Sequence, residues 1–323
     1  MFAFIVRRIV GLVVVLFAIT VMTFLIFFGT PGVDPSRQFA GRNPDPATIA
    51  AVRHQFGLDR PLPIRYALMM KRLFISRDLV SYGNTAVKVV PAIVSAAPVT
   101  FSLVIGAAFL WVVGSIVLGL IMVTFHGRWV DPFLMVLALI GISIPVFWLG
   151  EMANLITQDR LHDTFLFSWV PPLGYVPLTQ DPWQWFLHLI IPWITLSILY
   201  IGFYARILRA DLLEIRSEDY VRTARAKGLS PRSVLVRHML RTSMITFVSL
   251  FGLDFGVLVG GGALLTEVVF GLPGIGLLTY NAITSLDLPV IMATVIYGAF
   301  FITIMSAVVD VIYARLDPRI RPA

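Results

Sequence analysis

Long stretches without a charged residue constrain this chain more than any other feature. They run from Ile9 to Thr30 and, further along, over 89–125, 132–150, 183–205, 243–253, 255–266 and 288–309. About 20 apolar residues in a helix cross the hydrocarbon core of a bilayer. Only 13% of the residues are charged, whereas an ordinary soluble domain carries roughly 25%. The sequence therefore predicts an integral membrane protein and excludes a soluble enzyme.

Trimmed to bilayer thickness, these stretches predict an all-α integral membrane protein with six transmembrane helices. Residues 1–30 are predicted to hold the N-terminus and the first span, and residues 31–98 an extracytoplasmic segment with short helices. Residues 99–323 are predicted to form the membrane core. Its remaining spans are predicted at 99–123, 131–152, 185–205, 243–265 and 289–311, with a cytoplasmic region at 206–241.

Basic residues set the predicted orientation. Short cytoplasmic loops carry an excess of Lys and Arg, and nine of the 25 basic residues lie between Arg206 and Arg241. Arg7 and Arg8 precede the first span and fit the same side. The long outer segment is also rich in basic residues, but long segments cross the membrane largely regardless of charge. Both termini are therefore predicted to be cytoplasmic, in a multi-pass protein of the cell membrane.

Several kinds of chemistry are excluded or disfavoured by the residue types. The sequence has no cysteine, which excludes disulfides and thiolate nucleophiles. None of Lys71, Lys88 and Lys227 follows a Gly or precedes a Ser or Thr, so the Gly-Lys-Ser/Thr phosphate loop is absent from this sequence. The histidines form no pair at metal-ligand spacing, so no metal is expected. The net charge of +7 is attributed to membrane orientation and not to nucleic-acid binding.

The outer segment carries signals for ordered structure. Asp45 can cap a helix, Pro46 suits its first turn, and Gly57 suits the left-handed residue after its end. An amphipathic piece at 63–74 can lie along the membrane interface. Near 165–185 the chain is rich in Trp and Pro, which predicts a non-helical excursion at the headgroup level.

The cytoplasmic region contains two helix signals separated by a glycine. Ser217 can cap a short helix that has Glu218 and Asp219 in its first turn, and Gly228 suits the residue that ends it. Ser230 then caps a second helix with Pro231 at its first position. The pattern predicts a bent elbow at the membrane surface.

Two interpretations of the elbow stay open on composition alone. Ala224, Ala226 and Gly228 leave a small-residue patch surrounded by Arg222, Arg225 and Lys227, as a docking element would. A basic amphipathic loop that lies on anionic lipid has the same composition.

The sequence of this cytoplasmic region resembles that of a known family. The following twelve residues are similar to the coupling-helix motif of ABC importer permeases, in the form found in dipeptide, oligopeptide and nickel permeases: Asp219-Tyr220-Val221-Arg222-Thr223-Ala224-Arg225-Ala226-Lys227-Gly228-Leu229-Ser230. Five other segments of the chain are also similar to the family and occur in the same order as in the family. They lie at 56–63, 141–150, 171–175, 267–276 and 316–321. The generic motif has Glu-Ala-Ala where this chain has Arg222-Thr223-Ala224, which favours the peptide and nickel branch.

The resemblance implies one half of a transporter. A second homologous permease subunit, two cytoplasmic ATPase subunits that bind ATP and Mg²⁺, and an extracytoplasmic substrate-binding protein would complete it. It implies that the ATPase docks on the coupling-helix residues Asp219, Tyr220, Arg222, Thr223, Ala224, Arg225, Ala226, Lys227 and Gly228. We place Arg222, Ala224 and Gly228 in the ATPase groove as a hypothesis.

An acidic residue in a predicted span is a further candidate. Asp254 lies near the middle of the fifth span, where an acid costs about 2.5–3.5 kcal/mol on insertion scales, so it should face the bundle interior or water. It can line the translocation path together with Gly256 and meet an ammonium group of the substrate, or it can form a hydrogen bond or a charge pair between helices. The glycines at 256 and 260–262 are expected to allow close helix packing.

The loop after the fifth span is predicted to be an apolar re-entrant loop or plug at the outer gate. Its residues are Glu267, Phe270, Pro273 and Gly274. Its Gly-rich spacing does not match a dinucleotide-binding loop, and no strand precedes it.

The sequence thus predicts a non-enzymatic permease subunit that imports short peptides, driven by ATP hydrolysis in separate subunits. Similar permeases carry nickel chelates or glutathione, and these substrates remain alternatives. An ion-coupled secondary transporter would need more intramembrane acids or inverted repeats. An intramembrane enzyme would need a catalytic grouping, and none is recognisable.

Overall fold

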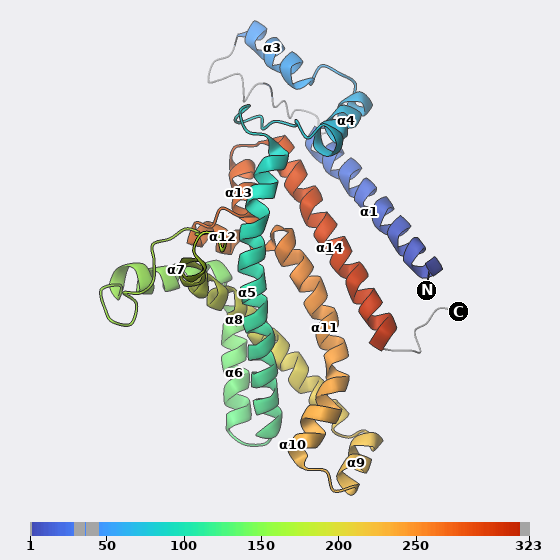
Figure 1. Ribbon diagram of the computed structural model, residues 1–323, viewed down its shortest axis with the longest axis vertical. Helices are drawn as coiled ribbons and strands as arrows, with labels where there is room; N and C mark the ends of the chain where they lie inside the picture. The colour runs from blue at the N-terminus through green and yellow to red at the C-terminus, as the bar shows by residue number, and fades with distance from the viewer. Residues whose placement is uncertain (1, 29–35, 37–44, 317–323) are drawn as a thin grey trace. The chain divides into compact units, whose positions relative to one another are not determined.

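The computed structural model describes residues 2–28, 36 and 45–316, and these are mostly helical (Figure 1). In these ranges the only β-type pairing is an isolated antiparallel bridge between Val80 and Lys88. The chain divides into two compact units. Unit 1 comprises Met1–Thr100, Gly256–Val268 and Pro273–Ile304, and unit 2 comprises Phe101–Phe255, Val269–Leu272 and Met305–Ala323.

Unit 1 contains the first span and the outer segment. Its helices are α1 (Phe2–Phe28), α3 (Pro46–Phe56), α4 (Leu62–Met70), the π-helical turns η1 (Lys71–Ile75) and η4 (Leu258–Gly262), α12 (Leu264–Phe270, of which Val269 and Phe270 belong to unit 2) and α13 (Ile275–Thr284). The start of α5 (Val89–Thr124) and most of α14 (Leu288–Leu316) also belong to it. Its apolar core joins α1, α4 and α14 through Phe24, Met69 and Met292.

The outer segment is ordered by the signals that predict it. The Asp45 side chain accepts a hydrogen bond of 2.8 Å from the Thr48 amide at the start of α3. Gly57 ends that helix with a φ of 67°. On α4, Tyr66 meets α1: its hydroxyl lies 2.7 Å from Thr20 Oγ1, and its ring packs edge-on against Phe24. The caps predicted at Asp45 and Gly57 are confirmed.

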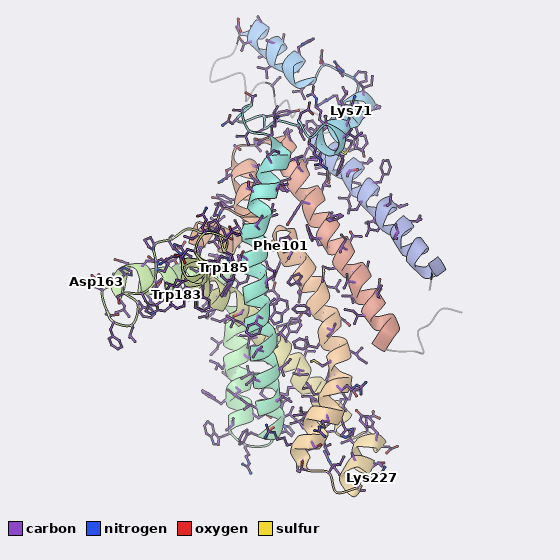
Figure 2. All side chains as sticks on the ribbon, viewed as in Figure 1. Lys71, Phe101, Asp163, Trp183, Trp185 and Lys227 are labelled. Carbon is purple, nitrogen blue, oxygen red and sulfur yellow. The ribbon has the colours of Figure 1, made fainter. Side chains whose placement is uncertain are left out.

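Unit 2 contains the remaining helices. They are α6 (Val130–Ser143), α7 (Val146–Asn154), η2 (Leu155–Arg160), α8 (Pro182–Ile215), α9 (Asp219–Ala226), α10 (Pro231–Ser233), η3 (Val234–Met239) and α11 (Leu240–Val257, of which Gly256 and Val257 belong to unit 1). The larger part of α5 and the end of α14 also belong to unit 2. Helices α6 and α8 pack so closely that a Cβ atom at Gly202 would lie 2.5 Å from the Ala138 carbonyl oxygen. Trp183 and Trp185 lie in the first turn of α8, after an irregular stretch (Figure 2).

The predicted spans need correction at several points. The described residues contain five helices long and apolar enough to cross a membrane, or up to seven if two bent helix pairs are counted as spans. Residues 131–152 are not one straight helix: Val130–Ser143 and Val146–Arg160 meet at 92°. The cause is Pro145, which pushes Ile144 into extended geometry (ψ 125°) and cannot donate a backbone hydrogen bond.

Other helices are longer or shorter than the predicted spans. Helix α5 begins at Val89, before the expected 99–123, and α8 runs on to Ile215, beyond the expected 185–205. The helix predicted at 243–265 already begins at Pro231, and its helical geometry breaks at Gly261, which has a φ of 109°. The last predicted span, 289–311, lies within α14.

Candidate functional site

The elbow between α8 and α11 is a short helix followed by a glycine turn. Helix α9 covers Asp219–Ala226, and Gly228 follows with a φ of 79°. Ser230 then accepts a hydrogen bond of 3.4 Å from the Ser233 amide and caps α10. Figure 2 labels Lys227 in this turn. Two helices joined by a left-handed glycine are therefore present where the sequence predicts them.

The start of α9 differs from the prediction. Ser217 does not cap it, because the N-cap residue is Glu218 and the Ser217 hydroxyl donates to the Glu214 carbonyl oxygen. Ser217 therefore closes the last turn of α8, and the first free amides of α9 receive no side-chain cap. The terminal segment at 316–321 that resembles the family lies almost wholly outside the described residues.

One face of α9 packs against the chain itself. Val221 and Ala224 are its buried residues, and η3 is the element that α9 contacts. The Tyr220 hydroxyl lies 3.1 Å from Thr242 Oγ1 and ties the start of α9 to α11. Ala224, one of the three residues that the hypothesis places in the ATPase groove, is thus buried within this chain.

The opposite face of α9 is exposed. Its exposed residues from the predicted coupling set are Asp219, Tyr220, Arg222, Thr223, Arg225, Ala226, Lys227 and Gly228. Arg222 and Asp219 form a loose ion pair at 3.6 Å on this face. A side chain at Gly228 would meet no atom of the described residues within 4 Å, so in this part of the chain the restriction at that position comes from its backbone conformation. A small, basic, exposed helix face anchored from behind is suited to receive another protein.

Asp254 in α11 has one hydrogen-bond partner in the described residues. The Tyr204 hydroxyl of α8 donates to Asp254 Oδ2 at 2.5 Å. Tyr204 is fully buried beside Trp111 of α5, and Trp111 in turn stacks on Tyr200 at 4.4 Å between ring centroids. The Asp254 side chain itself is only half-buried. The helix-to-helix hydrogen bond is thus present, and one carboxylate oxygen has no hydrogen bond from the described residues.

The glycines near Asp254 serve close packing. A side chain at Gly252 would come within 2.1 Å of Val309 Cγ2 on α14, within unit 2. Within unit 1, a side chain at Gly260 would come within 2.9 Å of the Gly298 Cα atom. Gly256 is buried. This agrees with the packing role expected for small residues in membrane helices.

Glu267 is the centre of a second polar cluster, within unit 1. Its side chain is fully buried and accepts hydrogen bonds from Thr100 Oγ1 at 2.6 Å and from the Leu277 amide at 3.0 Å. Thr100 Oγ1 also accepts from the Ile275 amide at 2.8 Å. A side chain at Gly274 would come within 2.4 Å of the Glu267 carboxyl group. Glu267 therefore joins α12, the start of α13 and α5.

The other predicted gate residues are distributed over both units. Gly274 touches Glu267, and Pro273 lies in the same loop of unit 1. Phe270 is buried in unit 2, where the neighbouring Val269 carbonyl oxygen accepts from Asn154 Nδ2 at 3.0 Å. Helices α12 and α13 meet at 88°, as in a broken span or a re-entrant loop.

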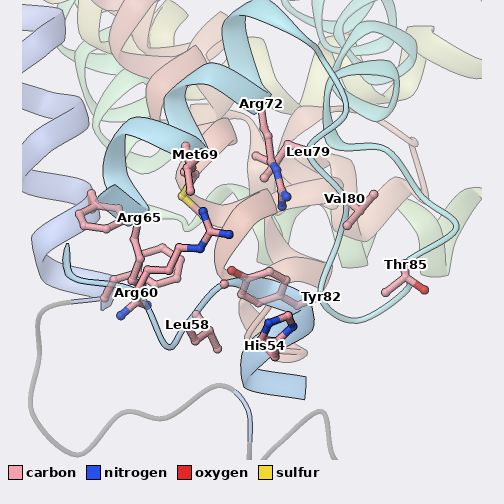
Figure 3. Close-up of a pocket in the computed structure, with 14 residues that line it drawn as sticks. His54, Leu58, Arg60, Arg65, Met69, Arg72, Leu79, Val80, Tyr82 and Thr85 are labelled. Carbon is pink, nitrogen blue, oxygen red and sulfur yellow. The ribbon is translucent and has the colours of Figure 1, made fainter. Parts of the chain in front are cut away.

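Two features of the outer segment are missed by sequence reasoning. Asp287 is buried and accepts hydrogen bonds from Ser81 Oγ and from the Tyr82 amide, more than 200 residues away in sequence. Tyr82 also lines a cavity of about 310 Å³, together with His54, Arg60, Arg65 and Arg72 among others (Figure 3). Burial raises the pKa of Tyr82 to about 12. The basic spacing in 63–74 is the only sequence signal for this cavity.

No group of three or more His, Asp or Glu side chains that could hold a metal is found in the described part of the chain. His126 and Asp131 do approach each other, with Nδ1 2.9 Å from Oδ2, but Arg209 binds the same carboxylate through two hydrogen bonds of 2.7 Å. This cluster is an ion pair that joins α6 to α8.

The described helices that are long and apolar enough to cross a membrane define a helical membrane protein. The family described as binding-protein-dependent transport system inner membrane component matches residues 115–322, and the family for the N-terminal part of such components matches residues 1–104. The chain belongs to this family of ABC importer permeases, which are multi-pass inner-membrane components and not themselves ATPases.

Relatives extend over the whole chain. A Brucella abortus protein named as a peptide transport system permease is 34% identical over 99% of both chains. The glutathione transport system permease protein GsiC of Escherichia coli is 35% identical over 99% of both chains. In a solved structure, the inward-facing MetNI methionine ABC transporter, one chain superimposes with a TM-score of 0.52 at 16% identity, covering 71% of this chain and 97% of that one. The last similarity concerns the fold alone.

Proposed function

We propose that this chain is a permease subunit of an ABC importer that moves short peptides into the cell. The family match, and relatives of full length that are named for peptide and glutathione transport, support the proposal. The observation that carries it is the exposed α9 face in the segment with the coupling-helix motif. The energy would come from ATP hydrolysis with Mg²⁺ in separate ATPase subunits, since the sequence has no Gly-Lys-Ser/Thr loop.

The proposed topology has six spans and cytoplasmic termini. Helices α1, α5, α8, α11 and α14 each count as one span, and the bent pair α6–α7 counts as the third. The pair α12–α13 would then be the re-entrant element at the outer gate. Residues 31–98 would be extracytoplasmic, and 99–323 the membrane core. The clustering of basic residues between Arg206 and Arg241 supports this orientation.

The proposed mechanism is a population shift between two conformations of the bundle. The ATPase subunits would dock on the exposed face of α9, and their closure on ATP would move the elbow. Because α9 has a buried face and packs against η3, this displacement would reach α11, which continues directly from η3. The substrate-binding protein would favour the outward-open state from the other side. A second homologous permease would form the other half of the path.

The substrate proposal depends on Asp254. Its second oxygen lacks a hydrogen bond from the described residues, and no described cation forms an ion pair with it. A carboxylate held among Tyr and Trp side chains can accept a peptide ammonium group. Glutathione also carries an ammonium group, and the GsiC relatives favour it as the second candidate.

Reconstitution tests the proposal. The purified chain, co-expressed with its permease and ATPase partners, should import labelled peptides of graded length only with ATP, whereas a nickel chelate should not be imported. Uptake by this chain alone, without any ATPase, would refute the assignment.

A variant at the elbow tests the docking surface. Gly228→Val should weaken ATPase recovery and uptake, because a β-branched residue is strained at a φ of 79°. Gly127→Val is the matched control, since Gly127 also has a positive φ and open space but lies outside the elbow. Normal ATPase binding and uptake in Gly228→Val would exclude the docking role.

A further inference from the structure

A second cavity lies within unit 2, beside the elbow. Its volume is about 820 Å³, which is within the range of ligand sites in proteins. One wall is the end of α5 near Leu120 and Val123, and the other is the stretch from Leu229 through η3, including Val236 and Met239. Val236 and Leu229 are exposed apolar residues. The cavity thus offers an open apolar groove at the end of a membrane helix.

The rim of this groove is basic. Arg216, Arg225 and Arg232 line it together with His126, and no Asp or Glu is among the described residues that line it. In the described part of the chain, no ion pair engages any of the three arginines. The Nδ1 atom of His126 is occupied by Asp131, and Arg209 neutralises that carboxylate. The net field at the groove is therefore positive.

The groove lies at the level where helices leave the membrane. Trp129, three residues beyond His126, is 75% exposed, and Trp is typical of the headgroup region. Arg128 stands over the Phe125 ring at 5.9 Å in the same turn. An apolar wall with a basic rim at this level fits a molecule that has an acyl chain and a phosphate.

We infer that the groove binds an anionic phospholipid of the cytoplasmic leaflet. The phosphate lies among Arg216, Arg225 and Arg232, and an acyl chain lies along Leu120, Val123 and Val236. Basic pockets between membrane helices on the cytoplasmic side bind anionic headgroups in this way. Arginine favours this role because its planar guanidinium group can give two hydrogen bonds to one phosphate.

The inference adds lipid sensitivity to the proposed coupling role. Arg225 belongs both to the groove and to α9, and Arg232 follows the Gly228 turn. A bound lipid therefore braces the elbow against α5. The inference depends on the proposed topology for the leaflet, but the binding measurement below does not depend on peptide transport.

Lipid retention on the assembled complex is the direct test. The complex is purified in detergent with a mixture of phosphatidylglycerol and phosphatidylcholine, and the retained lipids are counted by native mass spectrometry. The wild type should retain phosphatidylglycerol preferentially. The double variant R216Q/R232Q should lower that retention roughly tenfold or more, because each arginine near the surface strengthens the attraction to anionic lipid. R237Q is the matched control, since Arg237 is exposed on η3 but does not line the groove.

The remaining outcomes separate the possible occupants. Photo-crosslinking lipid should label the ends of α5 and η3 in the wild type only. Equal retention of both lipids, or equal loss in R237Q, would mean unspecific annular lipid and would overturn the inference. Displacement of phosphatidylglycerol by glycerol 3-phosphate would mean a site for free phosphate. Crosslinks from this groove to an ATPase subunit in place of lipid would mean a protein contact. Loss of transport with lipid retention intact would count against the proposed function alone.

Discussion

Two acidic residues in apolar helices are satisfied in different ways. Glu267 is fully buried, and its oxygens accept hydrogen bonds from Thr100 and from the Leu277 amide. Asp254 is half-buried, and Tyr204 is its one hydrogen-bond donor among the residues that the structure describes. An acid that is fully buried and accepts from donors on two other helices holds elements together, whereas a half-buried acid with one oxygen that no described residue bonds can take part in binding. The two units of this permease thus use the same chemistry for architecture and for a candidate transport role.

The largest effect is expected at Glu267. Glu267→Ala removes the acceptor for two donors, the buried Thr100 hydroxyl and the half-buried Leu277 amide, which should cost about 3 kcal/mol of stability. The thermal unfolding midpoint and the yield of assembled complex measure it. Glu151→Ala is the control, because Glu151 is exposed near the end of α7. Equal behaviour of the two variants would remove the structural half of the comparison.

A smaller effect on stability and a clear effect on uptake are expected at Asp254. Asp254→Asn keeps an acceptor for Tyr204, so the unfolding midpoint should change little, while uptake should fall about tenfold through the lost attraction to an ammonium group. Tyr204→Phe separates the two roles, because it removes the hydrogen bond and keeps the charge. Asp254→Asn with normal uptake would make this acid a structural residue like Glu267.

The smallest effect on stability is expected at Asp219, which extends the comparison to the surface. Its pair with Arg222 at 3.6 Å is exposed, and exposed pairs contribute about 0–1 kcal/mol. Asp219→Asn should therefore leave the unfolding midpoint unchanged, but it should weaken recovery of the ATPase subunits if the α9 face docks there. A loss of stability comparable to that of Glu267→Ala would show that the face is not a free surface.

The sequence predicts the local features of this molecule well. Asp45, Gly57 and Gly228 act within one or two turns, so their roles follow from residue type and spacing. Ser217 is the exception, because α8 continues to Ile215 and uses that hydroxyl at its own end. The bend at Pro145 is hidden in an apolar run whose composition suits either one span or two short helices.

The polar clusters could not be predicted, because they join distant residues. Thr100 meets Glu267 across 167 positions, and Ser81 meets Asp287 across 206. The residues around Thr100 and around Ser81 in the sequence form no pattern that indicates a distant acidic partner. Asp254 is recognisable as an acid in an apolar helix, but its link to Tyr204 depends on how α8 packs against α11. The sequence thus indicates which residues can take part in polar interactions, whereas their hydrogen-bond partners are known only from the fold.

Helix α8 has a mechanical consequence. Its 34 residues form a rod about 51 Å long, and Pro192 interrupts its backbone hydrogen bonding about 15 Å from the end at Pro182. The arm from Pro192 to the elbow is about 35 Å long. If the helix stays straight and pivots at this proline, its end near α9 travels more than twice as far as its end at Pro182. Under that condition, a large displacement of α9 would produce a smaller displacement at the far end of the helix, with a correspondingly larger force.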